Sequence, residues 1–297
     1  MRKLLTGFIV VIASVLLLSA CSSSGGKMTI GTLTYTENKI LGEMFKALVE
    51  DQTDISVDIK HDLATSPIIL EGMQNGDIDF AVQYTGTSIS SYTEIENPKD
   101  SEATLQQAKD FFAGDDFNFK FLDGFGFANT YAFTVRQEIA DEYGLEKVSD
   151  LVDIAPDFNA AFDTAWLERE NDGYPAFQEV YDIEFGNTNP MEIGLVYDAV
   201  KNDEVDIVLA YSTDPRIVAF DLKILEDDKN FFPPYDAAPA FRQEILDEHP
   251  ELEEIIDPLI GSIDEELMAT LSGKVDLDGE DIKDVAIEYL KEQNLLE

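Results

Sequence analysis

Hydrophobic residues recur along the chain with two periods, one typical of helices and one typical of strands. In residues 36–51 they repeat with the spacing of one helix face, at Ile40, Leu41, Met44, Phe45, Leu48 and Val49. Thr34 together with Glu37, or Thr36 alone, is expected to cap the start of this helix.

Strands are predicted on either side of that helix, followed by the first of two similar units. Segments 27–35 and 55–63 have the composition and alternation of short strands. Ser66 can then cap a helix whose first turn holds Pro67. After a turn, a strand with alternating apolar residues ends on Tyr84. The unit is thus a capped helix, a tight turn and a strand that delivers a tyrosine.

The second unit repeats this plan about 125 residues later. Asn189 is expected to cap a helix opened by Pro190, and the apolar strand that follows ends on Tyr211. Proline and tyrosine are 17 residues apart in the first unit and 21 in the second. The four extra residues correspond to about one helical turn.

This alternation predicts parallel sheets, and two such units suggest two lobes. Ligands of open parallel sheets bind beyond the carboxyl ends of the strands, where both tyrosines would lie. The local pattern is equally consistent with two ordinary tyrosines that cover a core.

The remaining segments are predicted to form a further strand and helix, an irregular segment rich in aromatic residues and proline, and an acidic helical C-terminal region. Residues 129–135 are predicted as a strand, and 138–151 as a helix followed by a loop. Residues 230–241, "NFFPPYDAAPAF", hold four aromatic residues and three prolines, which suits a hinge or cleft wall. From about Arg242 onwards the chain is expected to be helical and acidic.

The N-terminal residues have the character of a secretion signal. Arg2 and Lys3 precede an apolar run, so residues 1–20 are predicted to be a signal peptide. The ending Leu-Ser-Ala-Cys resembles a bacterial lipobox, with Cys21 as the lipidated first residue and 21–27 as a flexible tether. An uncleaved membrane anchor is the alternative, although the run is short for a span.

Composition and charge narrow the class of protein. The chain has 297 residues, with 44% hydrophobic and 27% charged, which suits a globular protein with a large core or two domains. Its formal charge of −41 argues against nucleic acid as a partner. The acidic residues could attract a cationic ligand. Their spread along the whole chain better fits a solvated surface in a saline or alkaline exterior.

Few residues support catalysis or metal binding. The only histidines are His61 and His249, and Cys21 is the only cysteine. The chain has no Gly-x-Ser-x-Gly elbow, no glycine-rich phosphate loop and no His-x-x-x-His pair. An enzyme is therefore not expected, nor is a metal site or cofactor, and the single Trp166 is expected to be buried.

A set of motifs, in order, resembles one known family. The chain is similar from 28 to 297 to the substrate-binding lipoproteins of bacterial ABC importers for osmoprotectants, namely glycine betaine, carnitine, proline betaine and choline. The motifs are "IGTLTYTENKILGEM", "NGDIDFAVQYTGT", "NTYAF", "RENDGYP", "AYSTDPRI" and "LEDDKNFFPPYDAAP". The resemblance implies an α/β fold of the two-lobed periplasmic-binding-protein type (type II), with two hinge crossovers and the ligand between the lobes. By this resemblance the first lobe comprises 28–128 and 232–297, and the second 129–231.

The resemblance also implies a cage of four tyrosines around a quaternary ammonium group. These are Tyr84 and Tyr235 from the first lobe, and Tyr131 and Tyr211 from the second. The residue type suits the chemistry, because a trimethylammonium group carries charge but has no hydrogen-bond donor. Aromatic faces offer it a negative quadrupole and an apolar wall together.

Further positions match family residues that hold the ligand's carboxylate or line the pocket. Thr87 and Arg169 match carboxylate-binding positions, and Asn129 matches a pocket position beside the second tyrosine. One departure concerns Leu33, where relatives often have a lysine or glutamine. Either Thr34 compensates for it or carboxylate binding is weaker.

The resemblance thus predicts a lipid-anchored, monomeric binding protein on the outer face of the cell membrane. It would pass its ligand to an ABC permease with its ATPase subunits. The alternative within the same fold is a protein for an amino acid or another small anionic solute, because fold does not fix function. In that case Arg169 would dominate binding and the tyrosines would tolerate alanine.

Overall fold

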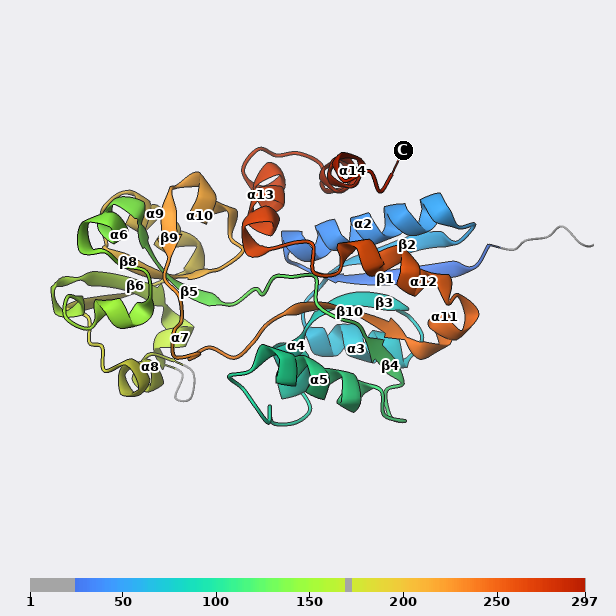
Figure 1. The fold of residues 1–297 in the computed structure, drawn as a ribbon, viewed down its shortest axis with the longest axis horizontal. Coiled ribbons are helices and arrows are strands. Elements are labelled where there is room, and N and C mark those ends of the chain that lie inside the picture. Colours follow the sequence, from blue (N-terminus) through green and yellow to red (C-terminus); the bar gives the residue numbers. More distant parts are fainter. Residues whose placement is uncertain (1–24, 169–172, 297) are drawn as a thin grey trace, which may run out of the picture.

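The structure is a computed structural model that describes residues 25–168 and 173–296, and it forms two α/β lobes (Figure 1). The predicted signal peptide, the lipidation site Cys21 and Arg169 lie outside the described residues. We call lobe 1 the part built on the sheet of order β2-β1-β3-β10-β4, and lobe 2 the part built on the sheet of order β7-β6-β8-β5-β9. No helix of the described residues is long and apolar enough to cross a membrane.

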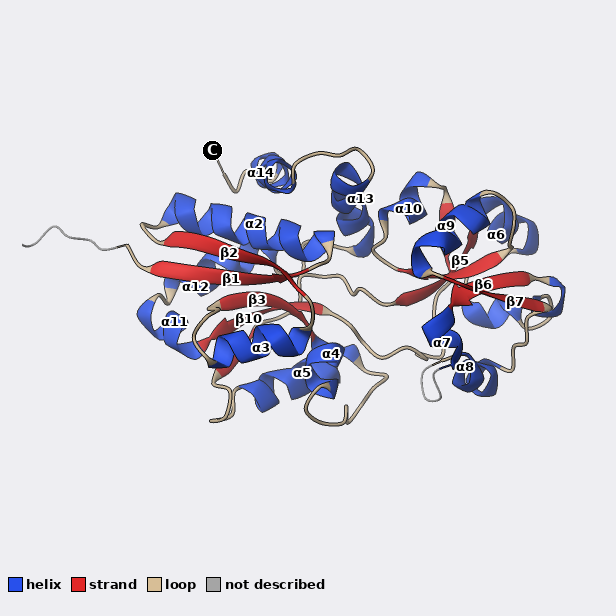
Figure 2. Ribbon diagram, turned by 180° about the vertical axis from the view of Figure 1, so that it is seen from behind, coloured by secondary structure: helices blue, strands red, loops and turns tan. Residues whose placement is uncertain are grey.

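Lobe 1 is formed by two separate stretches of the chain. The first stretch contains β1 (Lys27–Leu33), α2 (Thr36–Gln52), β2 (Ser56–Leu63), α3 (Ser66–Gln74), β3 (Phe80–Tyr84), α4 (Thr85–Ser90), α5 (Ser101–Phe112) and β4 (Phe119–Phe121). The second contains β10 (Ala237–Arg242), α11 (Gln243–Glu248), α12 (Glu251–Ile256), α13 (Glu265–Asp276) and α14 (Ile282–Glu292). Helix α2 covers one face of the sheet and α3 the other (Figure 2).

Lobe 2 is formed by the stretch between them. It contains β5 (Tyr131–Arg136), α6 (Gln137–Tyr143), β6 (Asn159–Asp163), α7 (Thr164–Glu168), α8 (Tyr174–Tyr181), β7 (Asn187–Met191), α9 (Ile193–Lys201), β8 (Ile207–Tyr211), α10 (Pro215–Ala219) and β9 (Leu222–Ile224). Its core is strongly aromatic and includes Phe133, Phe162, Phe177 and the fully buried Trp166, as the sequence predicted for the tryptophan.

The two sheets have the same topology, and both are mixed rather than wholly parallel. In lobe 1, β2, β1 and β3 are parallel, and β10 is antiparallel to β3 and β4. In lobe 2, β7, β6 and β8 are parallel, and β5 is antiparallel to β8 and β9. The antiparallel strand in each sheet is the one by which the chain enters from the other lobe. This crossover explains the departure from the predicted all-parallel pattern.

The two predicted units occupy equivalent places in the two sheets, but neither helix start was predicted correctly. The N-cap of α3 is Thr65 and not Ser66, and the second helix begins later than predicted. Pro190 lies in β7, paired in parallel register with Phe162, and does not open a helix. Strand β7 is an edge strand, where a residue without an N–H group is tolerated. Counted from the true helix starts, Ser66 in α3 and Ile193 in α9, both tyrosines lie 18 residues downstream. The repeat is therefore closer than the sequence suggested.

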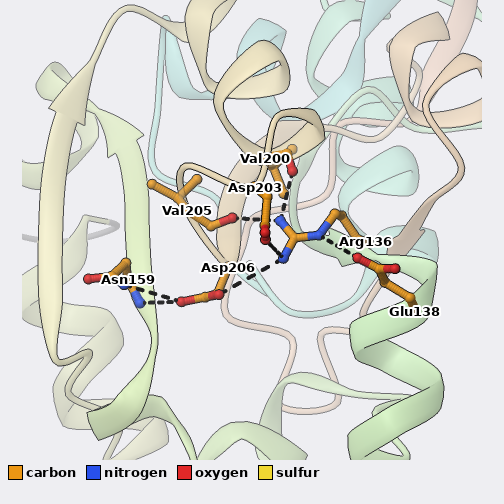
Figure 3. A network of polar contacts seen from close by, with 7 residues as sticks. All are labelled: Arg136, Glu138, Asn159, Val200, Asp203, Val205 and Asp206. Atoms are coloured by element: carbon orange, nitrogen blue, oxygen red, sulfur yellow. Dashed lines mark hydrogen bonds and ion pairs between the residues drawn. The ribbon is translucent and has the colours of Figure 1, made fainter.

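An arginine fixes the strand-to-helix corner of each lobe. In lobe 2 the Arg136 guanidinium donates to the carbonyls of Val200 and Val205, both at 2.8 Å, and pairs with Asp203 at 2.6 Å (Figure 3). In lobe 1 Arg242, the last residue of β10, lies at the same corner and pairs with Asp79 at 3.3 Å. Both arginines lie at the ends of β5 and β10 that are remote from Tyr84 and Tyr211. The site is therefore built at the opposite ends of the two sheets.

Candidate ligand-binding site

The two connections between the lobes run side by side and bring several predicted site residues together. Ala128 and Asp236 form an antiparallel bridge, and the Asn129 N–H donates to the Tyr235 carbonyl at 3.3 Å. Tyr131 begins β5 directly beyond this bridge. The carboxyl ends of β3 and β8, at Tyr84 and Tyr211, face the same region. Glu37 is hydrogen-bonded both to Tyr84 and to Thr213, two residues after Tyr211.

Tyr131 and Tyr211 form one aromatic wall on lobe 2. They are register partners on neighbouring strands, and their rings stack with centroids 5.1 Å apart and planes at 26°. Burial, followed by a hydrogen bond with Tyr131, raises the pKa of the Tyr211 phenol. Phe232 continues the wall, with its ring centroid 5.6 Å from that of Tyr131. At this separation the stacked pair leaves no room for a methylated ammonium between its rings, so it forms a single side of the site.

Tyr235 lies on the connecting segment and lines a cavity between the lobes. The cavity has a volume of about 280 Å³, and its lining includes Tyr131, Phe232 and Tyr235. The prediction of a cleft wall in 230–241 is confirmed for its first half, whereas residues from 237 onwards form strand β10. The connecting segment fits tightly against α4, where a Cβ on Gly86 would lie 2.2 Å from the Pro234 carbonyl oxygen.

Tyr84 is more deeply buried than the other three tyrosines and is held by an acid that the sequence analysis missed. Its side chain is 5% exposed, and its hydroxyl donates to Oε1 of Glu37 on α2. The Asn129 amide donates to the same oxygen at 2.7 Å, and Thr213 of lobe 2 adds a side-chain hydrogen bond. Glu37 therefore joins the end of β3, a connecting segment and lobe 2.

Glu37 was expected to cap α2 with Thr34, and that expectation was wrong. The N-cap residue is Tyr35, which makes no side-chain capping bond. The available signal was the helical phase, because position 37 lies three and four residues before Ile40 and Leu41 on the apolar face. An acid on that face requires partners from elsewhere in the fold.

The electrostatics of this cluster follow from its burial. Burial raises the pKa of the Glu37 carboxyl, the hydrogen bonds from Thr213, Tyr84 and Asn129 oppose this, and nearby Asp214 adds to it. Burial also raises the pKa of Tyr84 well above its usual value, and the charge of Glu37 raises it further. The raised pKa keeps the phenol protonated at neutral pH, so Tyr84 is the donor and Glu37 the acceptor of this hydrogen bond.

Replacing Glu37 by glutamine is expected to stabilise the protein as pH rises. Below the unfolded-state pKa the carboxyl is protonated in both states, and burial costs little. Above that pH the Glu37 carboxyl ionises in the unfolded chain, whereas burial keeps it protonated in the folded chain. The free energy of unfolding of the wild type therefore falls as pH rises, until the pH passes the raised pKa of the folded state. We expect Glu37→Gln to raise the melting temperature by about 3 °C at pH 7, and less near pH 4.

Thermal denaturation of both proteins between these pH values is the measurement. Glu43→Gln is the control, because Glu43 lies on the same helix beside His61 and outside this cluster. A melting temperature of Glu37→Gln that falls relative to wild type with rising pH would contradict the prediction.

The structure does not bring every predicted residue into this cluster. Thr87 is half-buried in α4, and its carbonyl accepts hydrogen bonds from Ser90 and Ser91. Thr34 is exposed just after β1. The neighbour of Tyr84, Thr85, was not singled out from the sequence. Its hydroxyl is buried and has no hydrogen-bond partner among the described residues.

Comparisons with known proteins agree with this architecture. Residues 26–292 match the family described as the substrate binding domain of ABC-type glycine betaine transport systems. The carnitine transport binding protein OpuCC of Listeria monocytogenes is 41% identical over 296 residues, which cover 97% of this chain and 96% of that protein. The glycine-betaine-binding protein of Pseudomonas aeruginosa is 30% identical over 281 residues, or 91% of this chain and 89% of that protein.

Solved structures show the same fold. A crystal structure of a glycine betaine/carnitine/choline ABC transporter protein is 38% identical, with a TM-score of 0.86 over 91% of this chain and 100% of that one. YehZ from Escherichia coli is 24% identical, with a TM-score of 0.81 over 92% of this chain and 100% of that one, and is alike in fold. These relatives are binding proteins, not enzymes. The chain belongs to the family of substrate-binding domains of ABC-type glycine betaine transport systems.

Proposed function

We propose that this protein is the extracytoplasmic binding component of an ABC importer and captures a quaternary ammonium osmoprotectant in an aromatic cage between its lobes. The observation that supports this most strongly is the gathering of tyrosines around the connecting segments. Tyr131 and Tyr211 stack on lobe 2, Tyr235 lines the interlobe cavity, and Tyr84 ends β3 of lobe 1. The names of the relatives point to the same ligands, carnitine and glycine betaine.

Aromatic rings are well suited to such a ligand in salty surroundings. Each desolvated contact between a ring face and a cation contributes about 0.5–2 kcal/mol. Several such contacts can reach micromolar affinity, on the order of −8 kcal/mol. Salt screens the interaction weakly inside a closed cleft, which matters because osmoprotectants are needed when external salt is high.

The carboxylate end of the ligand is proposed to meet Thr87 and Arg169, with Asn129 beside the second tyrosine. Leu33 gives no help there, because its side chain is 4% exposed in the lobe 1 core. Thr34 is proposed to compensate for it. We further propose that lipid on Cys21 anchors a monomer to the membrane, where it delivers the ligand to the permease and its ATPase subunits.

Isothermal titration of the purified protein with glycine betaine, carnitine, choline and proline betaine tests the function. We expect saturable binding of at least one ligand with a dissociation constant on the order of 1–100 μM. No binding of any of these up to about 1 mM would overturn the proposal. Binding of an amino acid in their place would instead favour a site for small anionic solutes.

A further inference from the structure

Glu37 is a buried acid for which the fold offers no cation. Its side chain is 4% exposed, and among the described residues no lysine, arginine or histidine forms an ion pair with it. Asp214, the acid whose charge acts on Glu37, forms an ion pair with Arg216 at 2.6 Å. Buried carboxylates are normally paired, because removing an unpaired charge from water costs several kcal/mol. Among the described residues, then, hydrogen-bond donors meet the Glu37 carboxyl and no cation pairs with it.

Hydrogen bonding alone does not explain why this residue is an acid. Three side chains meet its carboxylate, those of Tyr84, Asn129 and Thr213. A glutamine has the same shape and could accept from the phenol and the amide and donate to the threonine hydroxyl. It would do so without the cost of a buried charge. The charge itself is what sets Glu37 apart from a structural residue.

We propose that Glu37 determines the charge selectivity of the site, by holding a negative charge at the hydroxyl edge of the Tyr84 ring that favours ligands of net positive charge. This rests on the proposed function, because it assumes that the quaternary ammonium group binds at the tyrosines. Glu37 acts through its charge and through the hydrogen bond that it accepts from the Tyr84 hydroxyl. The ligand's cation supplies an opposite charge that none of residues 25–168 and 173–296 places in an ion pair with Glu37.

Two physical effects act together. The hydrogen bond from Tyr84 to a carboxylate is charge-assisted, so it shifts electron density onto the phenol and strengthens the attraction of the ring for a cation. The charge of Glu37 also attracts the ammonium group directly in surroundings of low dielectric constant. For a zwitterion, repulsion of the ligand's own carboxylate cancels part of this attraction. A purely cationic ligand such as choline feels all of it.

The test compares choline with glycine betaine by isothermal titration on wild type, Glu37→Gln and the control Glu43→Gln. We expect Glu37→Gln to weaken choline binding about tenfold and glycine betaine binding about threefold or less. The ratio of the two dissociation constants should then change by about threefold or more. Glu43→Gln should leave the ratio unchanged, and Glu37→Asp, which keeps the charge, should keep the ratio near that of wild type.

An unchanged ratio in a folded Glu37→Gln protein would overturn the proposal and leave Glu37 with a structural role. If wild type binds neither ligand, the proposed function fails before the selectivity question arises. If Glu37→Gln does not fold, titration of wild type at falling pH, over the range in which it stays folded, decides. Choline should weaken more than glycine betaine as Glu37 gains a proton, and parallel pH profiles would overturn the proposal.

The other groups that face Glu37 can be separated in that pH experiment. Tyr84 and Tyr35 have raised pKa values and stay neutral throughout the range. Asp214 forms an ion pair with Arg216 at 2.6 Å. A selective loss of choline affinity on acidification is assigned to Glu37, and not to Asp163, Asp227 or Asp236 near the cage, only if Glu37→Asp shifts it.

Discussion

Tyr211→Ala is expected to weaken binding of the preferred ligand by about 100-fold or more. The substitution removes one cation–π contact, worth up to about 2 kcal/mol when desolvated. It also removes the ring that stacks on Tyr131 at 5.1 Å, and such aromatic pairs contribute about 0.5–1.5 kcal/mol. Both effects act on the same wall of the site. The substitution removes the Tyr211 ring and leaves Tyr131 without its stacking partner, so it affects two of the four proposed cage residues.

The protein should remain folded, because Tyr211 is the last residue of β8 and is only half-buried. Titration calorimetry gives the affinity, and a thermal melt checks the fold. Tyr211→Phe keeps the ring and should bind within about threefold of wild type. Tyr143→Ala is the matched control, since Tyr143 is 50% exposed on α6, outside the site. A Tyr211→Ala protein that binds within about threefold of wild type would contradict the aromatic cage.

The strands that carry these tyrosines were predictable because local pattern and final structure agree. Around β3 and β8 the apolar residues alternate, a helix precedes each strand, and each strand ends on a tyrosine. Secondary structure can be predicted from sequence where the local preference agrees with the global fold in this way. Even here the helix preceding β8 was started too early, because Pro190 has the same local signature at a helix start as in the edge strand β7.

The role of Glu37 was not predictable in the same way. Its partners lie 47, 92 and 176 residues away in sequence, at Tyr84, Asn129 and Thr213. Only packing of the two lobes around the connecting segments brings them together. The capping-box pattern assigned Glu37 to a helix cap, because that pattern considers only residues close in sequence. The antiparallel strand in each sheet could not be predicted for the same reason, because its position depends on where the chain crosses between the lobes.

Gly86→Ala is expected to show how closely the site depends on the fit between α4 and the connecting segment. A Cβ at this position would lie 2.2 Å from the Pro234 carbonyl oxygen and 3.6 Å from the Tyr235 ring. Real Cβ atoms do not approach a backbone oxygen so closely, so either α4 or the segment that carries Tyr235 must move. We expect a loss of about 2–3 kcal/mol in the free energy of unfolding. Displacing Tyr235 from the cavity should also weaken ligand binding about tenfold.

Gly194→Ala is the control that distinguishes the steric clash at position 86 from the effect of alanine's higher helix propensity. Gly194 is the second residue of α9, as Gly86 is of α4, and a Cβ there meets nothing within 4 Å. Alanine favours helices over glycine by about 1 kcal/mol, so Gly194→Ala should be neutral or stabilising. Urea denaturation measures both variants. If Gly86→Ala were also neutral, the connecting segment would be free to shift, and the position of Tyr235 would not be fixed by this contact. Because α4 directly follows Tyr84, a destabilised Gly86→Ala would show that one glycine sets the distance between two of the four proposed cage residues.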